Sequence, residues 1–426
     1  MGSAQEFWGF IKDPIYGYIR FTEVERNIID TLAVQRLRRV RQLAGAEFVY
    51  PAANHTRFEH VLGTMYLAGV VSESLPVHLT AEEKQKVRLA ALLHDVGHAP
   101  FSHLFEPLLL KYMNRNHEET SRWIIADSTL GDVIHSQGFD AKDLSGLAVG
   151  RPSKLDKSFL GQIISSSFDV DKMDFVVRDS YHTGAGYGSV DVFRLIYTMD
   201  VLDGNLAADV TALPTLESLI LARLESFKAI YFHRASRAVQ MMLLRALEAA
   251  KDDLAILQAK TPDEYLEWDD YTVWSKLCTN PSSRNIMRDI SARRLLKCAY
   301  EKTFYAKDEL VSSVLTKENV RSKLEEEIAL KAKVPVSDVG IDAPTLPSVP
   351  YHYAMEIGPI DIPMFSRSRS GEMIPQKITE LSKVLDDLRV FMNIVRVYTK
   401  EQYRGQVSDA ASDVLGESPF SNVLSY

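Results

Sequence analysis

The stretch "LLHDVGHAPFSH" holds three of the chain's eleven histidines beside one aspartate, at the end of an apolar run. Neutral imidazole and carboxylate together suit Zn, Fe, Mn or Ni better than Ca or Mg alone. His94 and Asp95 are adjacent where a helix should end, so they need partners from elsewhere to hold one ion. His60 in "RFEH" and a carboxylate of "DVDK", Asp169 or Asp171, are the candidates. Two histidines and two carboxylates would leave positions open for water and a phosphate oxygen.

The other reading of these residues is that each is a polar core residue or a helix cap. That reading is the usual one for a single histidine on an apolar face. Here a His-Asp pair follows an apolar helix, with "RFEH" before it and "DVDK" after it. The combination favours a metal site over separate structural roles.

The composition is that of a globular protein with a sizeable core. The chain has 426 residues, of which 46% are hydrophobic and 25% are charged, with a net charge of -8. This length suggests two or three domains, or one large helical body with additions. The negative charge offers no global basic field for nucleic acid or an anionic membrane. Two cysteines exclude a disulfide framework, and no apolar run approaches the roughly 18 residues of a membrane span. We therefore expect a cytoplasmic protein with no membrane partner.

The hydrophobic pattern predicts a mainly α fold, with a helical body and a small α+β C-terminal piece. Residues 1–22 carry "FIKDPIYGYIRFT", which is typical of a hairpin, and residues 23–330 carry repeated helical patterns. The strongest of these predicts one continuous helix over residues 215–250. Residues 331–404 are rich in proline and β formers around one helical pattern, and residues 405–426 are polar and expected to be a flexible tail.

These motifs resemble the HD-domain phosphohydrolase superfamily. "HTRFEH", "LLHDVGHAPFSH" and "DVDKMDFVVRDSYHTG" are most similar to its deoxynucleoside triphosphate triphosphohydrolase branch, and "DPIYGYI", "NHEETS" and "RVYTKE" follow in the family order. The similarity runs from about Asp13 to Glu401. It implies a helical HD domain, a divalent metal ion (Mn, Fe, Zn, Ni or Mg) and a homo-oligomer, dimer or tetramer. The implied reaction converts a deoxynucleoside triphosphate into deoxynucleoside and inorganic triphosphate.

The resemblance also implies roles for single residues around the metal. The implied metal ligands are His60, His94, Asp95 and Asp171. His98 and His103 would face the α-phosphate and the bond that is attacked. His117, in "NHEETS", would lie near the leaving 5′-oxygen or the nucleophilic water. Glu106 stands where relatives often have aspartate, and would orient His103 or His117.

The same resemblance implies contacts to the nucleotide. The implied cations for the triphosphate are Arg57, Lys172 and Arg223. Tyr231 would form a steric floor under the sugar, and Asp179 would accept a hydrogen bond from the 3′-hydroxyl. Gln42 and Leu43 match positions that touch the sugar edge and the base. A further set matches residues that hold a guanine nucleotide effector between subunits: Asp30, Gln35 and Arg38. The alternative for that set is a cap and contacts within the chain.

Two other functions remain open from the sequence. One is an HD phosphohydrolase that acts on a nucleoside monophosphate or a cyclic nucleotide, although no "GYP" signature is present. The other is a nucleotide-sensing or single-stranded nucleic-acid-binding protein with little turnover. The acidic net charge argues mildly against nucleic-acid binding, and the complete set of proposed ligands argues against an inactive enzyme.

Overall fold

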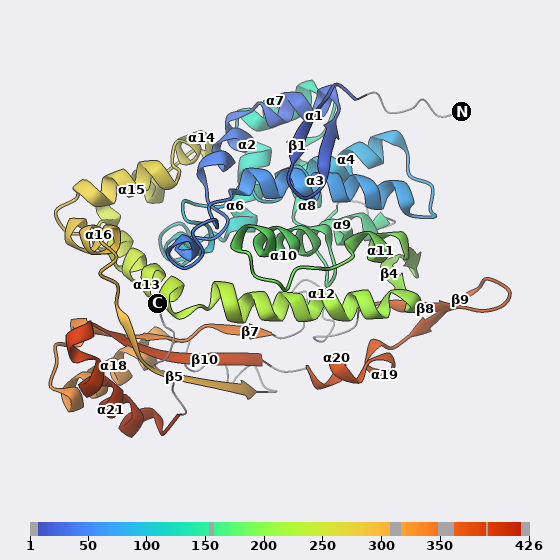
Figure 1. Ribbon diagram of the computed structural model, residues 1–426. Helices are drawn as coiled ribbons and strands as arrows, with labels where there is room; N and C mark the ends of the chain where they lie inside the picture. The colour runs from blue at the N-terminus through green and yellow to red at the C-terminus, as the bar shows by residue number, and fades with distance from the viewer. Residues whose placement is uncertain (1–6, 153–156, 307–316, 348–361, 389–390, 419–426) are drawn as a thin grey trace.

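The structure is a computed structural model that describes residues 7–152, 157–306, 317–347, 362–388 and 391–418. Helices form most of it, and the described strands form one two-stranded and two four-stranded sheets (Figure 1). The expected mainly α fold with a small α+β C-terminal piece is therefore confirmed. Among the described residues, no helix combines the length and the apolar character needed to cross a membrane.

The N-terminal segment forms the expected hairpin. Strands β1 (Gly9–Asp13) and β2 (Gly17–Phe21) pair antiparallel, and Gly17 supplies the positive φ of 77° that the turn requires. Helices α1 (Glu23–Ile29) and α2 (Leu32–Arg36) follow.

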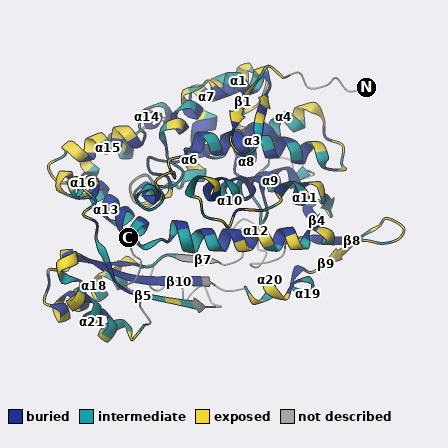
Figure 2. Ribbon diagram, viewed as in Figure 1, coloured by how far each residue is buried: buried dark blue, intermediate teal, exposed yellow. Residues whose placement is uncertain are grey.

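Four helices carry most of the residues predicted to do chemistry. They are α3 (Arg57–Ser74), α4 (Ala81–Leu93), α6 (His117–Asp127) and α10 (Val170–Thr183). Capping boxes begin the first three, which fixes their first turns. Helix α3 packs against both α4 and α10 and is buried along most of its length (Figure 2). The end of α4 and the first turn of α10 therefore lie beside α3, and Ser121 of α6 joins the end of α4 through hydrogen bonds with His94 and Gly97.

Shorter helices surround these four. They are α5 (Glu106–Leu108), α7 (Thr129–Ser136), α8 (Ala141–Ala148), α9 (Phe159–Ile164), α11 (Val192–Tyr197), α14 (Pro262–Leu266), α15 (Asp270–Thr279) and α16 (Arg284–Ser291). Together they enclose one large hydrophobic core.

The prediction of one continuous helix over residues 215–250 is wrong. The chain forms α12 (Leu213–Ser226), a π-helical turn (Phe227–Tyr231) and, after a break, α13 (Arg234–Ala249). At the break His233 adopts extended backbone angles, and its side chain accepts a hydrogen bond from the amide of Ala235. No glycine or proline lies at the break, and the adjacent Phe232 belongs to a hydrophobic cluster with Met392 and Ile394 of the C-terminal sheet.

The C-terminal sheet lies beneath α12 and α13 (Figure 1). Its central strand β10 (Phe391–Thr399) pairs antiparallel with β5 (Lys297–Ala306), β6 (Val339–Asp342) and β7 (Thr345–Pro347). Helices α18 (Glu318–Ala332) and α21 (Arg404–Leu415) pack together beside it. Because β5 and α18 belong to this unit, it begins before residue 331.

The tail from residue 405 differs from the expected flexible segment as far as it is described. Helix α21 buries Val407, Ala410 and Ala411, which share one face at helical spacing, in the hydrophobic cluster of the C-terminal sheet. Residues 419–426 lie outside the described residues.

A second four-stranded sheet links the two halves of the chain. Its strands run in the order β3 (Met199–Leu202), β4 (Asn205–Asp209), β8 (Met364–Arg367) and β9 (Met373–Gln376), with β4 and β8 parallel. Helices α19 (Ile378–Leu381) and α20 (Lys383–Asp387) follow β9 and lead towards β10.

Candidate active site

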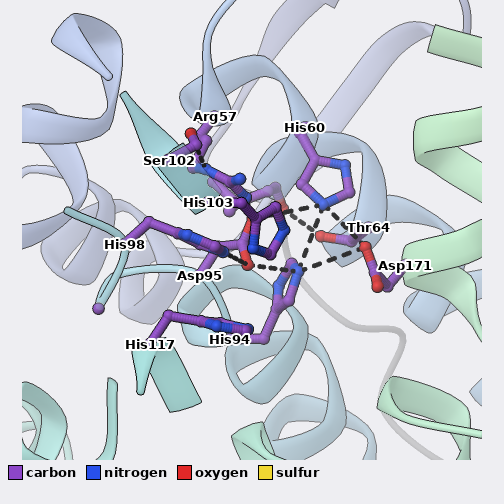
Figure 3. Close-up of polar contacts among 12 residues, drawn as sticks. Arg57, His60, Thr64, His94, Asp95, His98, Ser102, His103, His117 and Asp171 are labelled. Carbon is purple, nitrogen blue, oxygen red and sulfur yellow. Dashed lines mark hydrogen bonds and ion pairs between the residues drawn. The ribbon is translucent and has the colours of Figure 1, made fainter. Parts of the chain in front are cut away.

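Four predicted ligand side chains meet at one point (Figure 3). His60 comes from α3, His94 and Asp95 from the end of α4, and Asp171 from the first turn of α10. His60 Nε2 lies 3.3 Å from His94 Nε2 and 3.1 Å from Asp171 Oδ1. His94 Nε2 lies 3.3 Å from Asp95 Oδ1 and 3.7 Å from Asp171 Oδ1. His94 Nδ1 donates to the carbonyl of Ala91 at 2.8 Å, which leaves Nε2 as the donor atom for an ion.

These separations fit a divalent metal ion. Donors about 2.1 Å from an ion lie roughly 3.0 Å apart in octahedral geometry and roughly 3.4 Å apart in tetrahedral geometry. The pKa of Asp95 and that of Asp171 are held well below the usual value, because nearby positive groups and hydrogen bonds outweigh burial. Both carboxylates are therefore ionised, as metal ligands must be. The donor set fits Mn, Fe, Zn or Ni without selecting one of them.

A buried ion-pair chain supports His60 from behind. His60 Nδ1 donates to Asp174 Oδ2 at 2.8 Å, and Asp174 also accepts two hydrogen bonds from Arg178 at 2.8 and 2.9 Å. Arg178 in turn donates to Asp13 at 2.9 Å. A carboxylate on the far nitrogen fixes the ring orientation and raises the basicity of a ligating histidine. Sequence reasoning missed these three residues, although the spacing of four residues in "DFVVR" is a helical ion-pair signal.

A second imidazole cluster lies beside the ligands. The rings of His98 and His117 stack with centroids 4.3 Å apart, and His98 Nε2 lies 3.2 Å from Asp95 Oδ1. Glu106 accepts hydrogen bonds from His103 Nδ1 at 3.1 Å and from His117 Nδ1 at 2.7 Å. Burial lowers the pKa of His117, but the hydrogen bond to Glu106 outweighs it and the net shift is upward. Glu106 therefore contacts both histidines that it was expected to orient.

A tight turn after Pro100 places His103 over the site. Phe101 and Ser102 both have positive φ, 62° and 57°, which is costly for residues other than glycine. Asp270 accepts a hydrogen bond from the Phe101 amide at 2.7 Å, and burial raises the pKa of Asp270 to about 6. Ser102 Oγ accepts from Arg57 Nε at 2.7 Å and so ties the turn to the site. The sequence carried no signal for Asp270.

The three predicted cations lie on the walls of the same cavity. Arg57 bonds to Asp95 as well as to Ser102. Lys172 Nζ donates to Asp169 at 2.7 Å, and Asp169 also caps α10, so Asp171 is the carboxylate that reaches the ligand cluster. Arg223 is buried, and burial lowers its pKa to about 10.

Asp179 and Tyr231 meet at another part of the cavity. Asp179 accepts a hydrogen bond from Tyr231 and one from His55 Nε2 at 2.7 Å. Burial and the charge of Asp179 raise the pKa of Tyr231 well above its usual value, so its hydroxyl stays protonated and donates. The buried Gln42 Oε1 has no hydrogen-bond partner among the described residues. Sequence reasoning assigned no role to His55, although it is the first residue of the motif "HTRFEH".

One cavity of about 640 Å³ joins these parts, a volume typical of small-molecule sites. Thirteen predicted residues line it: Gln42, Leu43, Arg57, His94, Asp95, His98, His103, His117, Asp171, Lys172, Asp179, Arg223 and Tyr231. His60 and Glu106 do not line the cavity themselves. His60 contacts Asp171 and Glu106 contacts His117, and both of these partners do line it.

The candidate effector residues are not part of the cavity lining. Gln35 Nε2 donates to the carbonyl of Ile29 at 3.0 Å, and Gln35 Oε1 accepts from Arg38 Nε at 2.8 Å. Asp30 follows α1 as its C-cap and lies 3.6 Å from Arg26. Contacts within the chain thus exist for all three, and an effector role stays a prediction.

Family models match two parts of the chain, an HD domain over residues 57–141 and an HD associated region over residues 190–419. The deoxynucleoside triphosphate triphosphohydrolase SAMHD1 homolog of Dictyostelium discoideum is 32% identical over 69% of this chain and 60% of its own length. An uncharacterized protein of Methanocaldococcus jannaschii is 34% identical over 56% of this chain and 49% of its own length. The chain thus spans about half to three fifths of these two relatives.

Two solved structures are similar over nearly the whole chain. A hypothetical protein from Aquifex aeolicus superposes with a TM-score of 0.76 at 28% identity, covering 94% of this chain and 99% of its own. A phosphohydrolase from Bacteroides thetaiotaomicron superposes with a TM-score of 0.70 at 23% identity, covering 92% and 99%. The second likeness shows the fold alone.

Proposed function

The chain belongs to the HD-domain phosphohydrolase superfamily, and we propose that it is a metal-dependent hydrolase of deoxynucleoside triphosphates. Water adds to the α-phosphorus, the bond from phosphorus to the 5′-oxygen breaks, and the products are deoxynucleoside and inorganic triphosphate. One observation carries the proposal. A single cavity brings metal donors, an imidazole cluster, three cations and a carboxylate–tyrosine pair together. The Dictyostelium relative, which is named as a deoxynucleoside triphosphate triphosphohydrolase, supports the same substrate class.

The cations recognise the triphosphate. Arg57 is held by Asp95 and Ser102, so its guanidinium is fixed before a ligand arrives. Lys172 and Arg223 supply positive charge from two other elements of the wall. Preorganised cations stabilise the charge that develops on phosphoryl oxygens during in-line displacement.

The imidazole cluster supplies the proton that the leaving group takes up. A bound divalent ion lowers the pKa of a water ligand and polarises a phosphoryl oxygen. Glu106 holds the Nδ1 atoms of His103 and His117, so their Nε2 atoms are left for the substrate. His117, whose pKa is raised, carries the proton that the leaving 5′-oxygen takes up. His98 stacks on His117 and fixes its plane.

The carboxylate–tyrosine pair selects the sugar. Asp179 accepts a hydrogen bond from the 3′-hydroxyl with the lone pairs that His55 and Tyr231 leave free. The Tyr231 ring lies under the 2′ carbon and excludes a 2′-hydroxyl. Gln42 and Leu43 contact the sugar edge and the base. Assembly as a homo-oligomer, and an effector bound at Asp30, Gln35 and Arg38, are part of the same proposal.

The test is product identity. The purified chain is incubated with each deoxynucleoside and ribonucleoside triphosphate, alone and mixed, in Mn²⁺ or Mg²⁺, and products are separated by ion-pair chromatography. We expect deoxynucleoside and intact triphosphate, and a loss of at least about 100-fold in His94→Ala and Asp171→Ala. His135→Ala, on the exposed face of α7, is the matched control and should retain activity. Stepwise release of phosphate would refute the proposal, and turnover in mixtures alone would point to the effector residues.

A further inference from the structure

His55 is a buried histidine with a single side-chain hydrogen bond. It is 3% exposed, and its Nε2 lies 2.7 Å from Asp179 Oδ1. Its Nδ1 is buried and has no hydrogen-bond partner among the described residues. Leaving a buried nitrogen without a hydrogen-bond partner costs free energy. We therefore expect the one hydrogen bond that the ring does form to have a role in the site. That bond goes to a carboxylate in the cavity wall.

The backbone of His55 reaches a second residue of the same wall. The carbonyl of His55 accepts a hydrogen bond from the amide of Gln42 at 3.1 Å. Gln42 and Asp179 both line the cavity, from segments far apart in the sequence. His55 itself is not in the lining, and among the described lining residues its hydrogen bonds are with these two. One residue therefore links two groups of the proposed sugar site.

The surroundings hold the His55 ring in one orientation. The ring stacks on His182, with centroids 4.4 Å apart and planes 11° apart. His182 Nε2 lies 3.2 Å from Glu59 Oε2, and Glu59 completes the capping box of α3 directly after His55. Both α3 and α10 thus fix the ring. Support from two rigid elements is what a precisely placed binding group needs.

We propose that His55 is a positioning residue for sugar recognition, because it holds Asp179 and Gln42 in place for the 3′-hydroxyl of the nucleotide. This inference rests on the proposed function and adds a residue to it. With Tyr231 on the other oxygen, His55 leaves Asp179 one fixed acceptor direction on each oxygen. Among the described residues, His55 forms no hydrogen bond with the proposed metal ligands or with the imidazole cluster, so its effect should be confined to the sugar.

The experiment compares two substrates in three proteins. The substrates are a deoxynucleoside triphosphate and its 2′,3′-dideoxy counterpart. The proteins are the unaltered chain, His55→Phe, which keeps a ring against His182 but loses the donor, and His55→Gln, whose amide lies near the position of Nε2. We expect the unaltered chain to prefer the 3′-hydroxyl substrate in kcat/KM. His55→Phe should reduce that preference about tenfold, mainly through KM, and His55→Gln should restore most of it.

Each result has a distinct meaning. An equal loss for both substrates in His55→Phe would overturn the inference, because it would indicate a purely structural role. The same holds if the unaltered chain shows no preference for the 3′-hydroxyl. If His55→Phe does not fold, His55→Gln and His55→Leu carry the same comparison. Absence of triphosphate release from every deoxynucleotide by the unaltered chain would refute the proposed function itself, which separates the two failures.

Discussion

Asp174 tests whether the ion-pair chain behind His60 tunes the metal site. Asp174 Oδ2 accepts hydrogen bonds from both His60 Nδ1 and Arg178 Nε, whereas Oδ1 accepts from Arg178 Nη2. In Asp174→Asn an amide nitrogen replaces one carboxylate oxygen, so the remaining oxygen can occupy only one of these two positions. It should take the Oδ2 position, where it satisfies two donors. The new amide then faces Arg178 Nη2, and a donor meets a donor.

The expected magnitudes follow from this geometry. Arg178 and Asp174 are both fully buried, and among the described residues Asp13 is the remaining ion-pair partner of Arg178 in the variant. Breaking a buried ion pair costs about 3–5 kcal/mol. Because the pair with Asp13 remains, we expect a loss near the lower end of this range, so the free energy of unfolding should fall by about 3 kcal/mol. Loss of the carboxylate on a ligating histidine weakens metal affinity about 10–100-fold.

Two measurements check these values. Metal affinity is measured by chelator competition, and the free energy of unfolding by urea titration of the metal-free protein. Asp252→Asn is the control, because its side chain is 90% exposed and should change stability by less than about 0.5 kcal/mol. If Asp174→Asn binds metal within about threefold of the unaltered chain, the reasoning on the support of His60 is refuted.

Three further changes probe the surroundings of the cavity. Glu106→Gln removes the charge that raises the pKa of His117, so the protonated imidazole should persist only to lower pH; ring-proton NMR titration would show this, and an unchanged pKa would contradict it. Gly63→Ala places a methyl group 1.9 Å from Asp174 Oδ1, so we expect a loss of stability and metal affinity together, measured by urea titration and chelator competition. Met392→Ala leaves a cavity under the break after α12 and should cost about 2–5 kcal/mol in urea unfolding while raising KM for the nucleotide.

The helices and the clustering of the four predicted ligand side chains were the predictable part. Apolar periodicity and capping boxes mark α3, α4 and α6, and these signals are local in the sequence. The His-Asp pair and the flanking motifs then named the ligand set, and Asp171 rather than Asp169 followed from the resemblance. The structure adds the reason, because Asp169 is occupied as the cap of α10 and the partner of Lys172.

The residues that support the site could not be predicted from the sequence, and the reason is physical. Asp13 meets Arg178 across 165 positions, and His55 meets Asp179 across 124. No local pattern encodes such contacts, because they depend on how distant elements pack. The break at His233 is similar, since helical propensity alone favours continuation and packing on β10 overrides it. Helix α21 was missed because its apolar face is short and its surroundings are polar.

The matched HD domain alone does not contain a complete site. Residues 57–141 supply three of the four proposed metal donors, whereas Asp171, Arg223 and the carboxylate–tyrosine pair all come later in the chain. Tyr231 lies on the π-helical turn, which packs with Phe232 against Met392 and Ile394 of β10. The central strand of the C-terminal sheet therefore supports the turn that carries Tyr231, the proposed floor of the sugar site. Substrate selection should accordingly depend on the HD domain, on residues 142–189 and on the HD associated region together, with Gln42, His55 and Asp13 contributing from the part of the chain before the matched HD domain.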